Sequence, residues 1–273
     1  MRAVRKSIIL DLWHRVQVDD VSGLASQLAY FFLLSLFPLL IVVVSVLPYL
    51  PITEIDILGV IRDFAPGETM TLIESNLKEI MANQNGKLLS FGVIGTLWSA
   101  SNGINAIVLA FNKAYDVKES RSFVVARGMA ILFTFAMIFV FILALLLPVF
   151  GKEIGMFLFS EFGLSDEFLA IWNMLRWLVS SVILFIVFTV LYWLAPNKKI
   201  KCASVIRGAV FTTIGWVLTS WAFSYYVGNF GNYSVTYGSI GAIIVLMIWL
   251  YLSGFIIILG GEINAYYSKR EGC

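Results

Sequence analysis

The residue whose chemistry stands out is Glu262, a carboxylate that directly follows a long stretch without charge. Positions 238–261 contain no Asp, Glu, Lys or Arg, and Gly260 and Gly261 immediately precede the acid. A helix over these positions is about 36 Å long, enough to cross a hydrocarbon core of ~30 Å. Glu262 is therefore predicted to lie at the end of a helix near one membrane face, where a carboxylate can pair with a cation or bind a proton.

Three roles for Glu262 are compatible with this position. The carboxylate can form a structural ion pair with a basic loop residue, and the topology described below makes Arg127 and Arg207 the expected partners. The same pair can act as a gate that breaks during transport. Glu262 can also bind a proton and couple it to transport. The two preceding glycines favour the structural role, since glycines permit the close approach of helices that such a pair requires.

A second group of polar side chains lies within apolar stretches that are long enough to span a membrane. Such groups face the interior of a helix bundle or a water-filled cavity, so they can line a path for a polar headgroup or solute. They can equally hold helices together, at about 0.6 kcal/mol per interhelical hydrogen bond. The candidate residues of this polar pathway are Gln27, Tyr30, Ser35, Ser99, Asn102, Asn105, Thr212 and Thr219.

Enzymatic chemistry has little support in the residue types available. A metal-dependent hydrolase needs a cluster of His and carboxylate ligands, whereas the chain has a single histidine, His14. The sequence has no Gly-rich phosphate-binding motif. The basic residues are explained by membrane topology, so they give no reason to infer nucleic-acid binding. We therefore expect neither an enzyme nor a metal or cofactor site.

The amino-acid composition predicts that most of the chain lies in a membrane. Of the 273 residues, 60% are hydrophobic and 13% are charged, and the mean hydropathy is +0.89. Soluble domains carry about 25% charged residues. Long uninterrupted apolar runs favour helices over the short alternating strands of a barrel. The sequence therefore predicts an all-α polytopic membrane protein, a single helical bundle with additional amphipathic helices at the interface.

Six apolar stretches are long enough to cross a membrane. Pro48 and Pro51 end the first of them, and the second is the most polar. The fifth carries small and hydroxyl residues on one face, a pattern typical of close helix packing. The predicted spans are approximately 24–47, 88–111, 128–150, 172–194, 208–227 and 238–261.

Two segments outside the spans are predicted to be amphipathic. Residues 52–87 have apolar side chains at helical spacing but are too polar to span, and we expect them on the extracytoplasmic side. Met1–Asp20 shows the same pattern. This first helix lies either in the inner membrane interface or docked on the protein's own inner surface.

The distribution of positive charge predicts the orientation. Fourteen of the 19 Lys and Arg residues lie in the two terminal segments and in the connections after the second and fourth spans. Because loops rich in Lys and Arg stay in the cytoplasm, both termini are predicted to be cytoplasmic.

Four stretches of the sequence resemble one known family. They are LAYFFLLSLFPLL (28–40), LWSASNGINAIVLAFNKAYDVKESRSF (97–123), RGAVFTTIGW (207–216) and YGSIGAIIVLMIWLYLSGFIIILGGEINA (237–265). In this order they resemble the YihY/BrkB family of bacterial inner-membrane proteins, historically also labelled ribonuclease BN. The resemblance implies six transmembrane helices with both ends cytoplasmic, in a multi-pass protein of the bacterial plasma membrane. It links the chain to envelope integrity, resistance to host killing and export, and implies no settled activity.

The resemblance also covers an N-x-x-Y…R pattern after the second span, formed by Asn112, Tyr115 and Arg121. One interpretation is loop anchoring, in which Asn112 caps the helix end and Arg121 binds lipid phosphate. The other is recognition of a lipid headgroup.

We therefore expect a transporter or lipid-translocating protein of flippase or exporter type. Its expected partners are membrane lipids, with a polar lipid or small solute as cargo. The alternative is a non-transporting membrane scaffold for envelope assembly or stress resistance, and ribonuclease activity is not expected. The small-residue face of the fifth span can pack within one chain or between two copies, so a homo-oligomer stays open. A continuous cavity lined by the polar pathway would favour transport over the scaffold.

Overall fold

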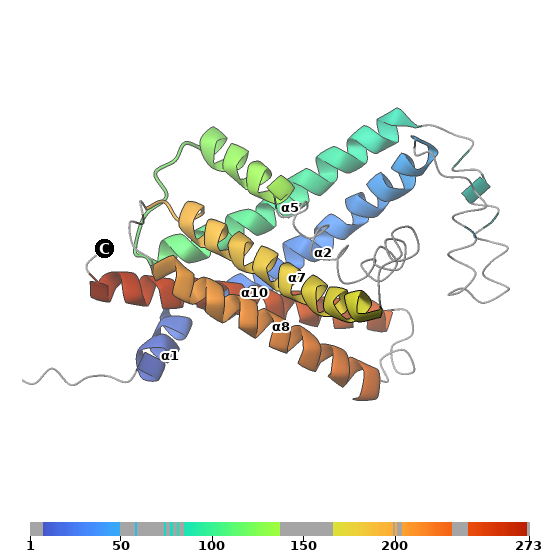
Figure 1. Ribbon diagram of the computed structural model, residues 1–273. Helices are drawn as coiled ribbons and strands as arrows, with labels where there is room; N and C mark the ends of the chain where they lie inside the picture. Colours follow the sequence, from blue (N-terminus) through green and yellow to red (C-terminus); the bar gives the residue numbers. More distant parts are fainter. Residues whose placement is uncertain are drawn as a thin grey trace, which may run out of the picture. The chain divides into compact units, whose positions relative to one another are not determined.

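All the elements that the structure describes are helical (Figure 1). The computed structural model describes residues 8–49, 58, 74, 77–78, 81, 85–136, 166–198, 200, 204–230 and 240–271. No strand occurs among these residues, which confirms the all-α class for this part of the chain. The helices are α1 (Ile8–Val18), α2 (Val21–Val46), η1 (Leu47–Tyr49), α5 (Gly86–Ala114), α7 (Asp166–Leu194), α8 (Ser204–Phe230) and α10 (Ile240–Glu271). A further helix covers Phe123–Ala136.

Four segments of the described chain are long and apolar enough to cross a membrane, judged by length and composition. They are Val21–Tyr49, Gly86–Ala114, Ser204–Val227 and Ile243–Arg270. Two shorter apolar stretches are also helical. Phe123–Ala136 overlaps the third predicted span, and Leu178–Leu194, the second part of α7, falls within the fourth. The rest of the third span, 137–150, and most of the predicted amphipathic segment 52–87 lie outside the described residues. The count of six spans therefore stays a prediction.

Asp20 forms the junction between α1 and α2. Its backbone has a φ of 52°, the left-handed conformation that ends many helices. Its side chain then caps the next helix, because Oδ1 accepts a hydrogen bond from the Gly23 N–H at 3.2 Å. A side chain at Gly23 would collide with this carboxylate. The junction thus fixes α1 beside the start of α2.

The structure divides into two compact units, and the boundary between them falls inside α2 and α5. The smaller unit, Phe32–Ala100, holds the C-terminal part of α2 and the N-terminal part of α5. Within it, a Cβ at Gly95 would lie 3.2 Å from Cβ of Pro38, and one at Gly92 would lie 3.0 Å from Cγ2 of Ile41. The small residues of α5 therefore serve as a packing face for α2, around the proline within that helix.

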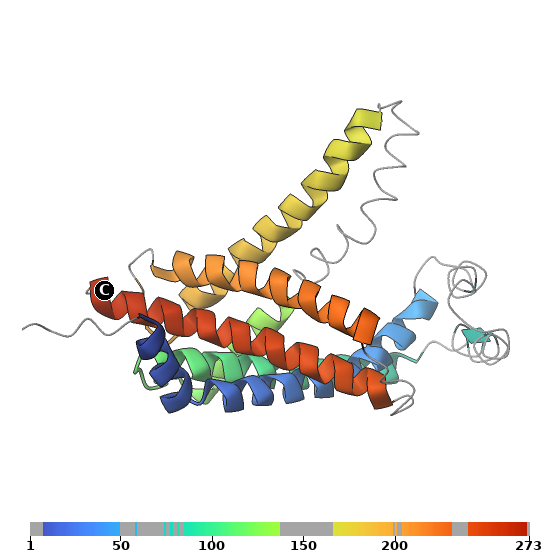
Figure 2. The same cartoon turned by 90° about the horizontal axis from the view of Figure 1, so that it is seen from below.

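The larger unit is organised around the pair α8 and α10, which lie side by side in Figures 1 and 2. The two helices approach closely at Gly208 and Gly260: a Cβ at Gly208 would collide with the Gly260 carbonyl oxygen. The Gly208 N–H donates to Oδ1 of Asn264 at 2.7 Å, which ties the first turn of α8 to α10. The small-residue face predicted for the fifth span thus packs within one chain.

A buried hydroxyl network joins α7 to this pair. The Tyr192 hydroxyl lies 2.6 Å from Oγ1 of Thr212 and donates to the carbonyl of Ile257 at 2.7 Å. Tyr192 and Thr212 are both fully buried. Such interhelical bonds between polar groups hold helices together where the surroundings offer no water.

The outward faces of these helices are apolar. On α8, Ile214, Leu218 and Trp221 are all more than half exposed. An exposed apolar surface of this extent is typical of helices that contact lipid.

The last helix is longer than the sequence indicated. The Gly-Gly-Glu sequence does not end it; α10 continues to Glu271. The reason is that both glycines serve close packing: a Cβ at Gly261 would lie 2.6 Å from the Phe111 ring, and one at Gly260 would collide with Thr212 and Tyr192. Glu262 therefore lies within a helix and not at its foot.

Candidate functional site

Glu262 is fully buried, with none of its surface exposed, and it is paired with a cation from α1. Nη1 of Arg15 lies 3.3 Å from Oε2 of Glu262 and donates a second hydrogen bond, also of 3.3 Å, to the carbonyl of Ala114. Ala114 is the last residue of α5, where unpaired carbonyls favour a positive charge. We call these two contacts the Arg15 latch; it joins α1, α5 and α10.

The cation at Glu262 is therefore not one of the two that we predicted. Arg127 instead donates from Nη1 to Oδ1 of Asn102 at 2.6 Å. Arg207 lies over the ring of Tyr267, 4.3 Å from its centroid. The correction arises because α1 packs against α10, so that an arginine far away in the sequence reaches the carboxylate.

The second oxygen of Glu262, Oε1, is buried and has no hydrogen-bond donor among the described residues. Asp19, four residues after Arg15 and directly after the end of α1, is close enough to act on Glu262 electrostatically. The Tyr115 hydroxyl is also buried without a partner in this part of the chain. Burial, and then the negative charge of Glu262, raise the pKa of Tyr115, so this phenol stays neutral at physiological pH. The carboxylate is thus held by one cation through one oxygen, while its other oxygen has no donor among the described residues.

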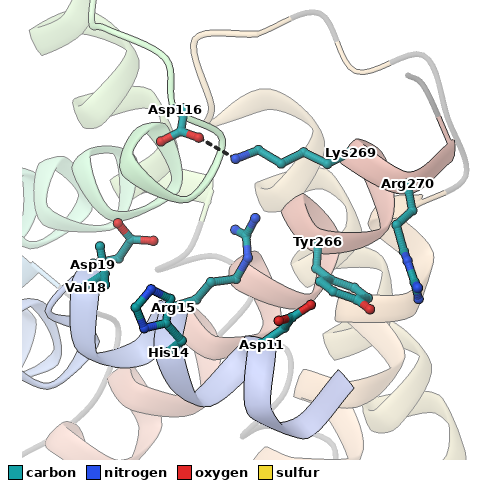
Figure 3. Close-up of a pocket in the computed structure, with 9 residues that line it drawn as sticks. All are labelled: Asp11, His14, Arg15, Val18, Asp19, Asp116, Tyr266, Lys269 and Arg270. Carbon is teal, nitrogen blue, oxygen red and sulfur yellow. Dashed lines mark hydrogen bonds and ion pairs between the residues drawn. The ribbon is translucent and has the colours of Figure 1, made fainter. Parts of the chain in front are cut away.

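A charged cavity of about 450 Å³ lies beside the latch (Figure 3). Figure 3 shows Arg15 extending from α1 between the other side chains of this cavity. Asp116, at the end of α5, forms an ion pair with Lys269 of α10 across one side of it. The residues that line the α1–α10 cavity are Asp11, His14, Arg15, Val18, Asp19, Asp116, Tyr266, Lys269 and Arg270.

Asp116 occupies a position where glycine is usual. The N–H of Val117 bonds to the Asn112 carbonyl at 2.9 Å and that of Asp116 to the Lys113 carbonyl at 3.0 Å, the two bonds of a Schellman motif. Asp116 has a φ of 53°, which costs a non-glycine residue about 1 kcal/mol or more. With the backbone in this conformation, the Asp116 side chain lines the charged cavity and pairs with Lys269.

Substituting Asp116 by asparagine should reveal the ion pair without disturbing the turn, because asparagine also tolerates the left-handed conformation. The hydrogen bond from Lys269, followed by its charge, lowers the pKa of Asp116. A lowered carboxyl pKa stabilises the fold above the unfolded value of about 4, and this stabilisation disappears as the pH falls through the lower folded value. We expect Asp116→Asn to cost about 0.5 kcal/mol at neutral pH, since the pair is largely exposed.

The measurement is thermal melting of both proteins in detergent between pH 7 and pH 3. The two melting temperatures should converge at the acidic end. A difference that stays constant over this range would show that the charge of Asp116 is not what stabilises the parent.

Asn112 connects the end of α5 to two loops. Its side chain donates to Glu119 Oε2 at 2.8 Å and accepts a bond from the Asn197 N–H at 2.7 Å. Asn197 in turn donates to the carbonyl of Lys118 at 2.9 Å. The loop after α5 and the loop after α7 are thereby held together. Asn112 thus anchors loops, and neither of these bonds caps the end of α5 as the sequence predicted.

Arg121 binds carbonyl groups in the same region. Its Nη1 donates to the carbonyl of Ala195 at 3.1 Å and its Nη2 to that of Pro196 at 2.9 Å. Both carbonyls lie just past the end of α7, where a cation is favourable. Lys198 from this loop lies over the ring of Tyr115, 5.4 Å from its centroid. The three residues of the N-x-x-Y…R pattern thus meet at one junction of α5 and α7. The polar groups of Asn112 and Arg121 bind protein there, whereas the Tyr115 hydroxyl has no partner among the described residues.

Substituting Asn112 by alanine should destabilise this junction by about 1 kcal/mol, because the N–H of the half-buried Asn197 loses its acceptor. Limited proteolysis would report the effect as faster cleavage after Lys118. Asn105→Ala provides the matched control, since Asn105 is half-buried in the same helix. Equal cleavage rates in the two variants would contradict the anchoring role.

The eight residues of the predicted pathway occupy different environments. Gln27 and Tyr30 are exposed, Thr212 belongs to the Tyr192 network, and Asn102 binds Arg127. The Ser35 hydroxyl donates to the Phe32 carbonyl of its own helix at 2.7 Å. Ser99 is buried, while Asn105 and Thr219 are half-buried. None of the eight is among the described lining residues of the α1–α10 cavity, so a transport path along these residues stays a prediction.

Sequence reasoning did not single out the residues of this cavity. One signal was present: Asp11, Arg15 and Asp19 follow each other at intervals of four. This spacing places Asp11 and Arg15 on one face of α1 and Asp19 directly after its end. Opposite charges at this spacing indicate a polar face that meets something specific or faces water. The partners on α10, Tyr266 and Lys269, have no comparable pattern.

The helices and the buried ion pair define a helical membrane protein with a charged cluster at one end. A model of the family described as virulence factor BrkB matches residues 12–272, and the chain belongs to this family. It is 54% identical over 265 residues to the ribonuclease-like protein YfkH of Bacillus subtilis, covering 97% of this chain and 96% of that relative. It is 31% identical over 274 residues to a UPF0761 membrane protein of Aliivibrio fischeri, covering 97% and 84% of the two chains. No solved structure matches.

These comparisons confirm the resemblance found in the sequence. The family consists of membrane proteins and is not a known enzyme family. The ribonuclease-like name belongs to one relative, and the described residues contain no group of three or more His, Cys, Asp or Glu side chains that could hold a metal ion.

Proposed function

We propose that this protein moves a polar-headed lipid across the bacterial plasma membrane and that the Arg15 latch closes the end of its helix bundle between transport events. The observation that carries the proposal is the fully buried Glu262, held within a candidate membrane span by a single arginine from a peripheral helix. A charged cavity lies directly beside this pair.

The energetics of the Arg15–Glu262 ion pair are compatible with a contact that breaks and re-forms. An ionisable residue within a membrane-spanning helix costs about 2.5 kcal/mol or more, and such residues commonly mark a transport pathway. A buried ion pair is often no more stable than apolar residues of similar size, so stability alone does not account for it. The 3.3 Å separation is longer than the roughly 2.8 Å of a tight charged hydrogen bond. A pair of this kind can exchange partners at low cost.

The exchange would link the cavity to the helices. If Glu262 accepts a proton or the cationic group of a cargo molecule, Arg15 loses its partner on α10 and keeps only the Ala114 carbonyl. The contact between α1 and α10 is then weakened, and the cavity can change shape. The carboxylate charge is required for this cycle because a neutral side chain attracts neither group.

A lipid is the cargo class favoured by the surroundings. Val18, which lines the cavity, is 60% exposed, and Leu10 and Trp13 on the same short helix are each 63% exposed. Apolar side chains with a tryptophan among them are typical of the membrane interface, where a headgroup and its acyl chains meet. The charged cavity and the exposed apolar side chains of α1 therefore match the two parts of a lipid.

The same exposed face favours the second candidate function. An exposed Leu10 and Trp13 can equally dock another envelope protein, as a scaffold would require. Under this alternative the Arg15 latch is a static structural contact.

Reconstitution into vesicles separates the two functions. The purified protein is inserted into vesicles that carry trace phosphatidylethanolamine or phosphatidylglycerol with a fluorescent acyl chain, and a membrane-impermeant reductant bleaches the outer leaflet. Transport predicts bleaching beyond the half that protein-free vesicles show. Bleaching that stops at one half with both lipids would favour the scaffold.

A further inference from the structure

We infer that the α1–α10 cavity binds a phosphate group joined to a primary amine, the headgroup chemistry of an aminophospholipid. The inference deepens the proposed function and rests on it for the identification of the bound headgroup with the cargo. The binding itself can be measured without any transport assay.

Two ion pairs, Arg15–Glu262 and Asp116–Lys269, engage part of the charge at the cavity. Of the other charged lining residues, the acidic Asp11 lies in α1 and the acidic Asp19 directly after it, whereas the basic Arg270 lies in the last turn of α10 (Figure 3). A ligand that carries one positive and one negative group can place its ammonium on the α1 side and its phosphate on the α10 side. A ligand with only one sign of charge would leave either the two carboxylates or Arg270 without a partner of opposite charge.

Several polar groups of the cavity are available to a ligand. Asp11 and His14 have no hydrogen-bond or ion-pair partner among the described residues. The Tyr266 side chain is 6% exposed, and its hydroxyl has no hydrogen-bond partner in this part of the chain. Arg270 packs its guanidinium over the Tyr266 ring, 5.1 Å from the centroid, a contact that leaves its N–H groups able to donate. A buried hydroxyl without a partner is costly, and a phosphate oxygen would satisfy it.

The volume of the cavity and the number of hydrogen-bond donors on the ligand restrict the class of headgroup further. The volume of about 450 Å³ lies in the range of small-molecule sites and is ample for a headgroup. A primary ammonium donates three hydrogen bonds, which the carboxylates of Asp11 and Asp19 can accept. A quaternary amine donates none, and a glycerol headgroup has no positive charge. Binding should therefore decrease from ethanolamine to choline and glycerol headgroups.

Native mass spectrometry measures this preference directly. The protein is equilibrated in micelles with equal amounts of phosphatidylethanolamine, phosphatidylcholine and phosphatidylglycerol, and the retained lipids are counted. We expect about tenfold more bound phosphatidylethanolamine than either competitor, the factor that one additional charged hydrogen bond provides. Equal retention of the three lipids would overturn the inference.

Two variants test the two sides of the cavity. Asp11→Asn removes the expected acceptor of the ammonium, and Arg270→Gln removes the expected donor to the phosphate; each should reduce the preference about tenfold. Asp11→Glu and Arg270→Lys keep the charges and should restore it. Lys113→Gln is the matched control, since Lys113 is an exposed cation of α5 that does not line the cavity. A preference that persists in both neutral variants would place the binding elsewhere.

Soluble competitors identify the source of the headgroup. If phosphoethanolamine displaces the bound lipid while ethanolamine and inorganic phosphate do not, the free zwitterion is itself a ligand. If none of the three competes, the lipid is required, and both results support the site.

Lipid movement without any headgroup preference would refute this inference and leave the proposed function intact. A preference without movement would retain the binding site and refute transport.

Discussion

Replacing Gly260 by alanine should destabilise the protein by about 3 kcal/mol. The added methyl group would collide with the hydroxyls of Thr212 and Tyr192, which are fully buried and bonded to each other at 2.6 Å. Accommodating it requires that α8 and α10 separate or that the hydroxyl network breaks. The gain of about 1 kcal/mol in helix propensity from Gly to Ala is too small to compensate. Thermal melting in detergent measures the loss.

Gly128→Ala is the matched control for this substitution. Gly128 is also helical, but a Cβ there would meet no atom within 4 Å. The control should leave the melting temperature unchanged or raise it, by up to about 1 kcal/mol in stability. Similar behaviour of the two alanine variants would show that the close approach at Gly260 does not hold α8 to α10.

Replacing Arg15 by methionine should cost about 3 kcal/mol of stability, because it leaves the buried charge of Glu262 without its cation. This value is at the low end for a broken buried pair, since the Arg15 side chain is 19% exposed and part of its charge is already solvated. Glu262→Gln should cost only about 1 kcal/mol, because the amide oxygen still accepts a bond and Arg15 can turn toward water.

The double variant Arg15→Met/Glu262→Gln makes this prediction specific. It contains no unpaired buried charge, so it should be more stable than Arg15→Met alone. A double-mutant cycle on the melting data gives the coupling between the two sites, expected at about 2 kcal/mol. Additive effects would contradict a direct interaction between Arg15 and Glu262.

The helical class and the positions of the apolar helices followed directly from the sequence. Length and hydropathy determine which segments can cross a membrane, and these properties are local. For the same reason, α7 and α8 contain the whole of the predicted spans 172–194 and 208–227. The family assignment was also accessible, because its motifs are contiguous.

The partner of Glu262 could not be predicted from the sequence in the same way. Arg15 and Glu262 are 247 positions apart, and their contact depends on how α1 packs against α10. Positive charge in the loops near the same membrane face suggested Arg127 and Arg207, yet each of these engages another side chain. Topology assigns residues to a side of the membrane and does not select among the cations there.

The polar residues within the spans illustrate a further limit. A serine or threonine in a helix often bonds the carbonyl one turn earlier, as Thr96 does with Gly92 and Thr213 with Ala209, both at 2.8 Å. Such a hydroxyl needs neither water nor a substrate. Sequence alone cannot distinguish it from Thr212, which reaches across to Tyr192 on another helix.

The central claim is that the charge of Glu262 drives opening of the Arg15 latch during lipid movement. The direct measurement compares the rate of leaflet exchange of fluorescent phosphatidylethanolamine in vesicles that contain equal amounts of folded parent protein or Glu262→Gln. We predict a rate at least about tenfold lower in the variant, with its melting temperature close to that of the parent, since one charged interaction contributes about 1.5 kcal/mol or more. An unchanged rate in a folded Glu262→Gln protein would contradict the account.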